Sequence, residues 1–239
     1  MITKATSDFS QFDFSSGEVI LIDKPIGWSS FKAVYKIRQA TGVKKVGHAG
    51  TLDPLASGLL IICTGKKTKE ITKYQDFEKT YTGTITLGQS SPSMDLETEI
   101  SSTNSTENIT EKQILEIRDT FVGKIAQIPP MYSAIKVNGK SLYKMARKGK
   151  TIERLPREIT VSSFEIKNIS LPQVDFEIVC SKGTYIRSIA NDFGEKLCCG
   201  GLLSSLRRTK IGCYSVEDAL DTNEFAVKIK DEIGRFVEI

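Results

Sequence analysis

A glycine-rich turn that runs directly into an apolar segment constrains this 239-residue chain most. Residues 47–58 read GHAGTLDPLASG and hold the chain's single histidine, His48, and an aspartate, Asp53, that precedes Pro54. Glycine permits backbone angles that other residues avoid, and proline fixes its own φ and restricts the residue before it. The apolar run at 59–63 predicts a core strand. We therefore expect a stiff loop that presents the Asp53 carboxylate, and a turn that merely caps the strand is the alternative.

Composition and charge exclude several classes of protein. The chain is 39% hydrophobic and 26% charged, which is typical of globular proteins. No apolar run approaches the ~20 residues of a membrane span, and the first residues lack the pattern of a signal peptide. The 5 cysteines show no CxxC spacing, and the chain has one histidine that could join them as a ligand, so we expect no metal site. Free thiols suit a reducing compartment, and we predict a cytoplasmic protein.

Basic residues are concentrated in one segment. Between positions 136 and 157 they are opposed by Glu153 alone, whereas the chain after residue 215 is mainly acidic. Tyr132 and Tyr143 accompany these cations, and rings beside cations suit the bases and phosphates of RNA. A polyanion-binding face is one interpretation, and a solvated lysine-rich helix is the other. The basic residues are Lys136, Lys140, Lys144, Arg147, Lys148, Lys150, Arg154 and Arg157.

Local patterns predict the elements around these segments. A strand at 18–23 is followed by a turn and by a helix that a serine caps and Gly42 ends. Alternation at 80–88 predicts a strand whose inward face begins with Tyr81, in a structural or a functional role. A helix opened by Thr184 would carry Arg187 in its first turn. A cation there opposes the helix dipole, and such a conflict often marks a functional site.

Four motifs, in this order along the chain, resemble those of the TruB-type tRNA pseudouridine-55 synthases. They are DKPIGWSS at 23–30, GHAGTLDPLASG at 47–58, PPMYSAIKVNGKSLYKMAR at 129–147 and CSKGTYIRSIANDFG at 180–194. Two departures are small. Lys79 stands one residue from the lysine of the family's KxYxxxxxLG motif, and Ser91 and Ser93 replace the threonines of its TxTxD turn, where Asp95 keeps the acid.

The resemblance implies an α+β fold with a mixed, mainly antiparallel sheet flanked by helices. We expect a polar N-terminal tail at 1–16 and a catalytic domain at 17–220 with a thumb-like RNA-gripping arm at 129–150. A short extension would follow at 221–239. Many relatives carry a C-terminal RNA-binding PUA domain, and we expect this chain to be a short form without it.

The resemblance also assigns roles to single residues. Asp53 would be the nucleophile or base. Arg187 would pair with it and keep it ionised, because a nearby positive charge lowers the pKa of an aspartate. Tyr185 would support this pair. Tyr81 and Leu206 would lie on either side of the target uracil.

The expected substrate is uridine 55 in the T-loop of tRNA. Because a stacked uridine is out of reach, it must be flipped out, and His48 would fill the vacated stack. A lone histidine is otherwise usually structural. The cations expected to contact the RNA backbone are Lys24, Lys136, Lys140, Lys144, Arg147, Arg207 and Arg208.

Pseudouridine formation is an isomerisation, so we expect an intramolecular transferase that needs no cofactor and no metal and acts as a monomer. A non-catalytic module that binds or folds tRNA is the alternative. The presence of Asp53, Tyr81 and Arg187 favours the enzyme. A glycosidase would need a second acid near these motifs, and none is present.

Overall fold

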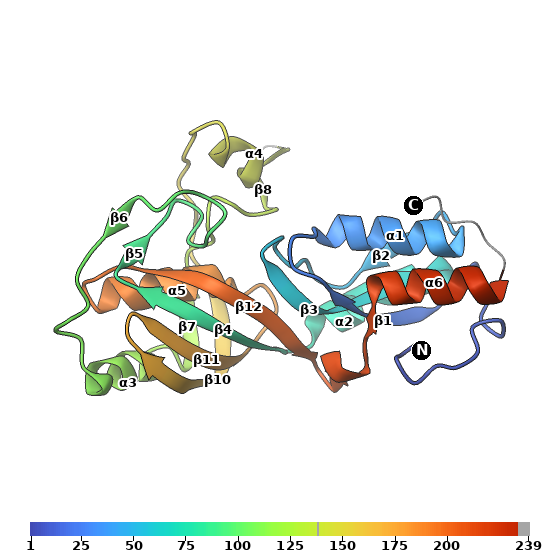
Figure 1. Ribbon diagram of the computed structural model, residues 1–239. Helices are drawn as coiled ribbons and strands as arrows, with labels where there is room; N and C mark the ends of the chain where they lie inside the picture. Colours follow the sequence, from blue (N-terminus) through green and yellow to red (C-terminus); the bar gives the residue numbers. More distant parts are fainter. Residues whose placement is uncertain (138, 234–239) are drawn as a thin grey trace. The chain divides into compact units, whose positions relative to one another are not determined.

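Two strands carry the chain between the two units of the structure, a computed structural model that describes residues 1–137 and 139–233 (Figure 1). Unit 1 comprises residues 1–81 and 206–239, and unit 2 comprises residues 82–205. The division falls inside β4 (Lys79–Leu87) and inside β12 (Gly201–Ile211). Helices accompany a mixed, mainly antiparallel sheet, and the expected α+β fold is confirmed.

In unit 1 the strand order is β14-β1-β3-β12-β4, with β2 on β3 and β13 on β12. β3 pairs antiparallel with β1 and β2 but parallel with β12. The further strands are β1 (Val19–Lys24), β2 (Val46–His48), β3 (Ala56–Thr64), β13 (Tyr214–Ser215) and β14 (Leu220–Asp221). The helices are α1 (Ser30–Thr41), η1 (Gly65–Glu70), α2 (Ile71–Asp76), η2 (Val216–Asp218) and α6 (Thr222–Ile233).

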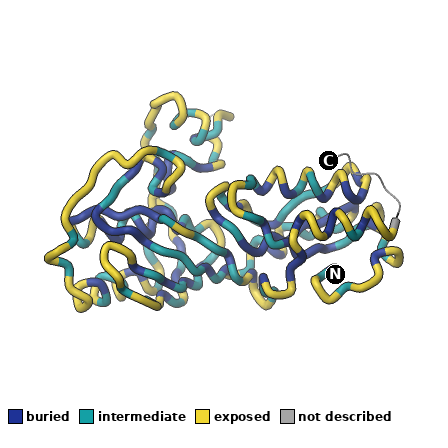
Figure 2. Tube along the Cα trace, viewed as in Figure 1, coloured by how far each residue is buried: buried dark blue, intermediate teal, exposed yellow. Residues whose placement is uncertain are grey.

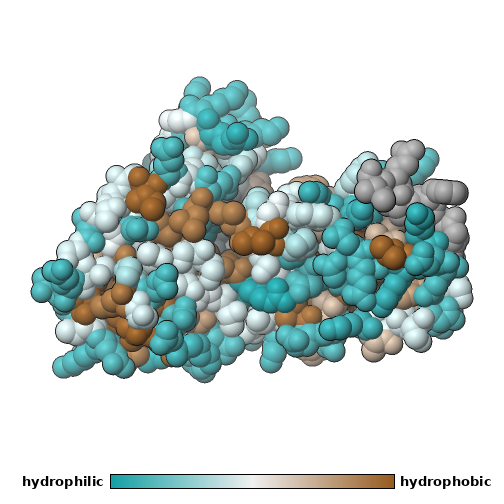
Figure 3. Space-filling model, in the orientation of Figure 1, coloured by the Kyte–Doolittle hydropathy of each residue, from teal (hydrophilic) through white to brown (hydrophobic). Residues whose placement is uncertain are grey.

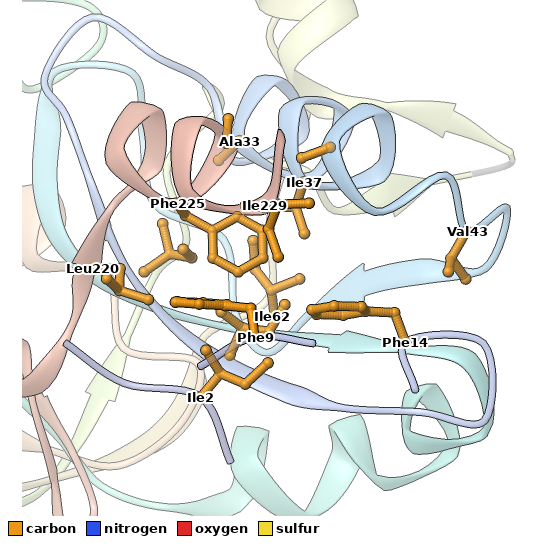
Figure 4. Close-up of a cluster of buried hydrophobic side chains, with 14 of the residues drawn as sticks. Ile2, Phe9, Phe14, Ala33, Ile37, Val43, Ile62, Leu220, Phe225 and Ile229 are labelled. Atoms are coloured by element: carbon orange, nitrogen blue, oxygen red, sulfur yellow. The ribbon is translucent and has the colours of Figure 1, made fainter. Parts of the chain in front are cut away.

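Helices α1 and α6 lie side by side on one face of this sheet, and apolar side chains fill the space beneath them (Figures 1 and 4). Ile37 of α1 and Phe225 and Ile229 of α6 are fully buried above Ile62 of β3. In Figure 2 both helices alternate between buried and exposed positions, as a helix with one packed face must. Burial of this apolar stripe fixes α1, and with it the turn that precedes it.

The first residues do not form the polar tail that we expected. Ile2 bridges to Ile20 of β1, and the rings of Phe9 and Phe14 pack edge-on against Phe225 at 5.8 and 6.2 Å. All three of these N-terminal apolar side chains are buried (Figure 4). They stand singly among polar residues without a helical or strand period, so the sequence pattern hides them. The segment expected as an extension likewise supplies α6 to this core, and residues 234–239 lie outside the described part of the chain.

In unit 2 the strand order is β12-β4-β11-β10-β7. β10 pairs antiparallel with β11 and β7, and the rings of Phe121, Phe164, Phe176 and Phe193 pack on one another beside them. The strands are β5 (Gln89–Ser90), β6 (Ser102–Thr103), β7 (Gly123–Gln127), β8 (Lys136–Val137), β9 (Lys140–Ser141), β10 (Arg157–Ser170) and β11 (Gln173–Cys180). The helices are α3 (Glu111–Asp119), α4 (Leu142–Ala146) and α5 (Ile186–Lys196).

Two helix starts test the capping predictions. Ser29 caps α1 by accepting a hydrogen bond from the Lys32 N–H, and Gly42 ends the helix in the left-handed region, both as predicted. The predicted start of α5 at Thr184 is wrong, because the helix begins two residues later, at Ile186. Thr184 bonds back to the Ser181 carbonyl at 2.9 Å instead of opening the helix, and Tyr185 is the N-cap with an extended backbone.

Candidate active-site residues in each unit

Asp53 lies in the reversal between β2 and β3 of unit 1, and its side chain is half-buried. Where β12 runs parallel to β3, Arg208 is the register partner of Gly58. A Cβ on Gly58 would lie 2.3 Å from the Arg208 carbonyl oxygen, and its φ is +106°, so only glycine fits. The tight approach of these two strands fixes the end of the loop that carries Asp53.

Hydrogen bonds to the backbone hold the other side of this loop. The Ser30 hydroxyl accepts a hydrogen bond from the Leu52 N–H at 2.8 Å and donates to the Leu52 carbonyl at 3.1 Å. The Gly27 N–H donates to the Pro54 carbonyl at 2.8 Å, and the Ala56 N–H to that of Asp53 at 3.1 Å. The residues on both sides of Asp53 are therefore tied to the first turn of α1 and to the loop before it.

Lys24 is fully buried, and this corrects its expected role at the RNA backbone. Its Nζ donates to the carbonyls of Pro25, Trp28 and Ala56 at 2.9, 2.6 and 2.5 Å. Burial lowers its pKa to about 8, and the neighbouring Asp53 carboxylate opposes this shift. Because the buried ammonium donates to three carbonyls, it has no N–H left for a phosphate. Lys24 therefore braces the loop instead.

Arg208 needs the same correction. It is 1% exposed, with its Nε donating to the Leu59 carbonyl at 2.7 Å and its Nη2 to the Gly50 carbonyl at 3.2 Å. Gly50 precedes Asp53 and Leu59 follows it, so one guanidinium clamps the two ends of the loop. The expectation failed because a basic pair in sequence, Arg207–Arg208, points to opposite faces of a strand.

The other member of this pair is partly exposed. The two Nη atoms of Arg207 lie 3.1 and 2.6 Å from the carboxylate oxygens of Asp23, and its Nη1 also donates to the Ser57 hydroxyl at 3.3 Å. Leu206 is the register partner of Ala56, three residues after Asp53. The next strand is β4, where Thr80 accepts a bond from Thr209 and Tyr81 is buried. The strand of Leu206 thus lies beside the end of the Asp53 loop, and the strand of Tyr81 lies on the far side of β12.

His48 ends β2 and is half-buried. Burial lowers its pKa below the ordinary value of 6.5, so the imidazole is neutral at neutral pH. Phe31 of α1 meets it edge-on, with 5.8 Å between the ring centroids. The imidazole is therefore packed against an aromatic ring of the helix that precedes it.

Arg187 lies in the first turn of α5 in unit 2 and is 3% exposed. Its Nη1 donates to the Ser93 carbonyl at 2.9 Å and its Nη2 to the Tyr132 carbonyl at 2.7 Å. Its Nε lies 3.5 Å from Oδ2 of Asp95, which is also buried. The conflict between this cation and the helix dipole is therefore offset by a carboxylate and two carbonyls.

Asp95 and Gln127 are the residues to which sequence reasoning gave no role. Asp95 stands at the acid position of the TxTxD-like turn, and that was the available signal. Gln127 is 2% exposed, accepts a hydrogen bond from the Tyr185 N–H at 2.8 Å and donates to the Tyr185 carbonyl at 3.0 Å. This two-way clamp holds the start of α5, and no pattern in the sequence announces it. The ring of Tyr185 has the Arg157 guanidinium 5.9 Å from its centroid.

The thumb-like arm folds on a few buried side chains. Met131 and Leu142 are buried, the rings of Tyr132 and Tyr143 meet edge-on, and the Tyr143 hydroxyl donates to Glu97 at 2.5 Å. The pair Asn138–Gly139 predicts a tight turn, and Asn138 lies outside the described residues. The surface around α4 is mostly hydrophilic in Figure 3. The four arm cations that we expected at the RNA backbone are exposed and accessible to a phosphate: Lys136, Lys140, Lys144 and Arg147.

Among residues 1–137 and 139–233, no group of histidine, cysteine or acidic side chains is placed to hold a metal ion. Within the same ranges, no helix has the length and hydrophobicity that crossing a membrane requires.

The sequence of this chain matches models of one protein family. Residues 38–186 match the TruB family pseudouridylate synthase N-terminal domain, and residues 187–232 match the tRNA pseudouridylate synthase B C-terminal domain. The chain is 52% identical over 220 residues to tRNA pseudouridine synthase B of Flavobacterium johnsoniae, across 89% of this chain and 96% of that protein. The Phocaeicola vulgatus protein of the same name is 48% identical over 219 residues, across 89% and 93% of the two chains.

Two solved structures share the fold. One chain of a Cbf5-Nop10-Gar1 complex matches with a TM-score of 0.71 and 26% identity, over 97% of this chain and 64% of that one. A chain of an H/ACA RNP bound to a substrate RNA containing 2'-deoxyuridine gives a TM-score of 0.68 at 26% identity, over 92% and 56%. This chain therefore spans less than two thirds of these solved chains.

Proposed function

The chain belongs to the TruB family of pseudouridylate synthases, and from this we propose that it converts uridine 55 in the T-loop of tRNA to pseudouridine with Asp53 as the reacting carboxylate. One observation carries the proposal. The loop of Asp53 is braced by the buried cations Lys24 and Arg208 and by Ser30, while the Asp53 side chain itself stays half-exposed. A protein that only needed a turn here would not bury two charges to hold it.

The reaction moves one bond. The bond between ribose C1′ and uracil N1 breaks, the base turns, and C1′ joins C5. C5 loses its proton, and N1, which carried none in uridine, gains one. No atom is gained or lost and no electron is transferred, so the chemistry needs a fixed, ionised carboxylate and a site that keeps the detached base from escaping. Asp53 acts as nucleophile or base, and Arg187 is its support in this proposal.

The base must be held while it turns. In the proposal Tyr81 and Leu206 lie on either side of the uracil, and Tyr185 supports the reacting groups. Neutral His48 occupies the gap that the flipped nucleotide leaves in the T-loop, where a stacked ring offsets part of the cost of unstacking. The support for this role is its lowered pKa and its edge-on contact with Phe31.

Exposed cations supply the grip on tRNA. Lys136, Lys140, Lys144 and Arg147 of the arm are accessible to phosphates, and Arg207 is partly so, although it already pairs with Asp23. Phosphate contacts supply much of the affinity and no sequence information. Neutralising the four arm cations should weaken binding and flatten its salt dependence without altering the fold.

The test uses the purified chain and an unmodified tRNA transcript. Chemical mapping of pseudouridine should give a single modified position, 55, and a transcript with cytidine at that position should remain unmodified. Asp53→Asn should bind the transcript and leave it unchanged. A wild-type protein that binds tRNA tightly but forms no pseudouridine would support the non-catalytic module instead, and modification at another position would refute the assignment to uridine 55.

A further inference from the structure

The outer face of α1 presents aromatic side chains to solvent. Phe31 is 75% exposed and Tyr35 is 52% exposed, one helical turn apart. Large exposed rings are uncommon on a helix whose other face is packed, and a cluster of them marks a contact surface.

Cations share this face with the rings. The Lys32 ammonium lies 4.3 Å from the centroid of the Trp28 ring, and the Arg38 guanidinium lies 5.6 Å from that of Tyr35. Phe31 in turn touches His48, the residue proposed to enter the T-loop. The α1 outer face, defined as Phe31, Lys32, Tyr35 and Arg38, is thus continuous with the proposed RNA site within unit 1.

Helix α6 lies beside α1 on the same sheet and provides a comparison (Figure 1). Its exposed residues are mixed in charge: Glu224 pairs with Lys228 at 2.9 Å, and Lys230 is followed by Asp231. Val227 is 57% exposed, and the hydrophobic patch visible on α6 is small and ringed by hydrophilic surface (Figure 3). By contrast, every charged residue from position 24 to position 52 is a lysine or an arginine.

We infer that the α1 outer face is a second RNA-binding surface, on which unpaired loop nucleotides stack beside the one that is modified. This inference rests on the proposed function for the identity of the RNA, a tRNA. From Phe31 to Arg38 the helix rises about 10 Å, which matches roughly three stacked bases at ~3.4 Å each. Rings offer base stacking and the flanking cations offer phosphate contacts, the combination that binds single-stranded RNA.

A protein partner fits this face less well. An apolar interface would bury Lys32 and Arg38 without acids to pair them, at a cost in desolvation. A second copy of this chain would bring the same cations face to face. A polyanion removes that cost, because its phosphates replace the water around the cations.

The experiment measures binding of a fluorescent unmodified tRNA transcript to the full chain, by anisotropy over a salt titration. One double variant removes the rings, Phe31→Ala with Tyr35→Ala, and another removes the charges, Lys32→Gln with Arg38→Gln. The matched control is Val227→Ala with Lys230→Gln on α6. All of these positions are exposed. Thermal melts check that each variant is folded before its binding is compared.

Loss of the rings should raise Kd about tenfold or more and leave the salt slope unchanged, since no charge is removed. Loss of the charges should reduce the slope of log K against log salt by about 1.4, or ~0.7 per cation. The α6 control should stay within about twofold of wild type, as distant surface changes do. Single variants Phe31→Ala and Tyr35→Ala then divide the effect between the two rings.

Two results would overturn the inference: wild-type affinity in the ring variant, or an equal loss in the α6 control. If sedimentation shows a wild-type dimer that the ring variant converts to monomer at unchanged tRNA affinity, the face is a contact between copies. This experiment distinguishes failure of the second RNA-binding surface from failure of the proposed function. A wild type that modifies position 55 while the ring variant binds normally refutes only this surface. A wild type that binds tRNA through α1 but makes no pseudouridine refutes only the proposed reaction.

Discussion

The two units hold their key charged residues in opposite ways. In unit 1 the buried cations Lys24 and Arg208 donate to backbone carbonyls and so fix the loop of Asp53. In unit 2 the backbone does the holding, because carbonyls of Ser93 and Tyr132 fix the buried cation Arg187. One arrangement positions a carboxylate that stays half-exposed, and the other positions a cation that is almost fully enclosed.

Under the proposed function, this difference separates the residue that reacts from the residues that position it. A buried charge is tolerated only when its hydrogen-bonding groups are satisfied, so each of these cations is locked in one geometry. Asp53 stays half-exposed, and hydrogen bonds made by the backbone of Leu52 and Pro54 help to hold the loop around it. Substitution of Asp53 should therefore reduce activity alone, whereas substitution of Lys24, Arg208 or Arg187 should reduce both activity and stability.

The largest effect is expected for Asp53→Asn. Because the loop is braced through backbone groups, the variant should fold like wild type and bind tRNA with similar affinity. Turnover should fall by more than about 10⁴-fold, the scale seen when a reacting group is removed. Single-turnover formation of pseudouridine measures this, and a melt checks the fold. Substantial residual activity would show that another residue carries the reaction.

Arg187→Lys should come next, with activity lower by about 10²–10³-fold. A lysine keeps the charge but cannot reach the Ser93 carbonyl, the Tyr132 carbonyl and Asp95 together, since these match the planar guanidinium. Unlike Asp53→Asn, this variant should also melt at a lower temperature. Arg157→Lys, at a half-buried position in the same unit, is the control and should change neither quantity much. A fully stable but inactive Arg187→Lys would mean that the carbonyl cradle contributes nothing to stability.

Lys24→Met tests the brace of unit 1. It leaves the carbonyls of Pro25, Trp28 and Ala56 without their shared donor, and we expect a loss of about 2–3 kcal/mol in the free energy of unfolding. A loosened loop should lower kcat about 10²-fold, as a misplacement of about 1 Å does, with little change in KM. The control is Arg207→Gln, which breaks a partly exposed pair with Asp23 and should cost less than about 1 kcal/mol. Equal losses in the two variants would refute the bracing role.

The sequence predicted the local structure around the proposed reacting residue better than the side chains that brace it. The turn of Asp53 before a core strand, the capped start of α1 and the strand of Tyr81 follow from local patterns, because glycine, proline, serine and alternating residues act on their neighbours. Lys24 and Arg208 were predicted to contact RNA, but both are buried. The prediction was wrong because the sequence does not show which face of a strand a basic residue occupies. Gln127, Phe9 and Phe14 depend on partners more than 50 residues away, which no local pattern reveals.

The smallest predicted effect is a change with pH in the contribution of Lys24 to the free energy of unfolding. Burial lowers the pKa of Lys24 from 10.5 to about 8, so between these values the folded protein releases a proton that the unfolded chain keeps. Stability rises with pH wherever the unfolded state binds more protons, so the cost of burying the charged form is complete below about pH 8 and is relieved as pH rises through it.

Other groups oppose this trend. Burial raises the pKa of the Cys63 thiol and of the Tyr74 hydroxyl to about 12, and both therefore favour folding less as the medium becomes alkaline. These contributions are the same in wild type and in Lys24→Met, so the difference between the two proteins isolates Lys24. Urea unfolding from about pH 7.5 to 9.5 should show wild type gaining up to about 2 kcal/mol relative to the variant. A difference that stays constant across this range would mean that Lys24 keeps its proton in the fold, held by its three carbonyls and the nearby Asp53 carboxylate.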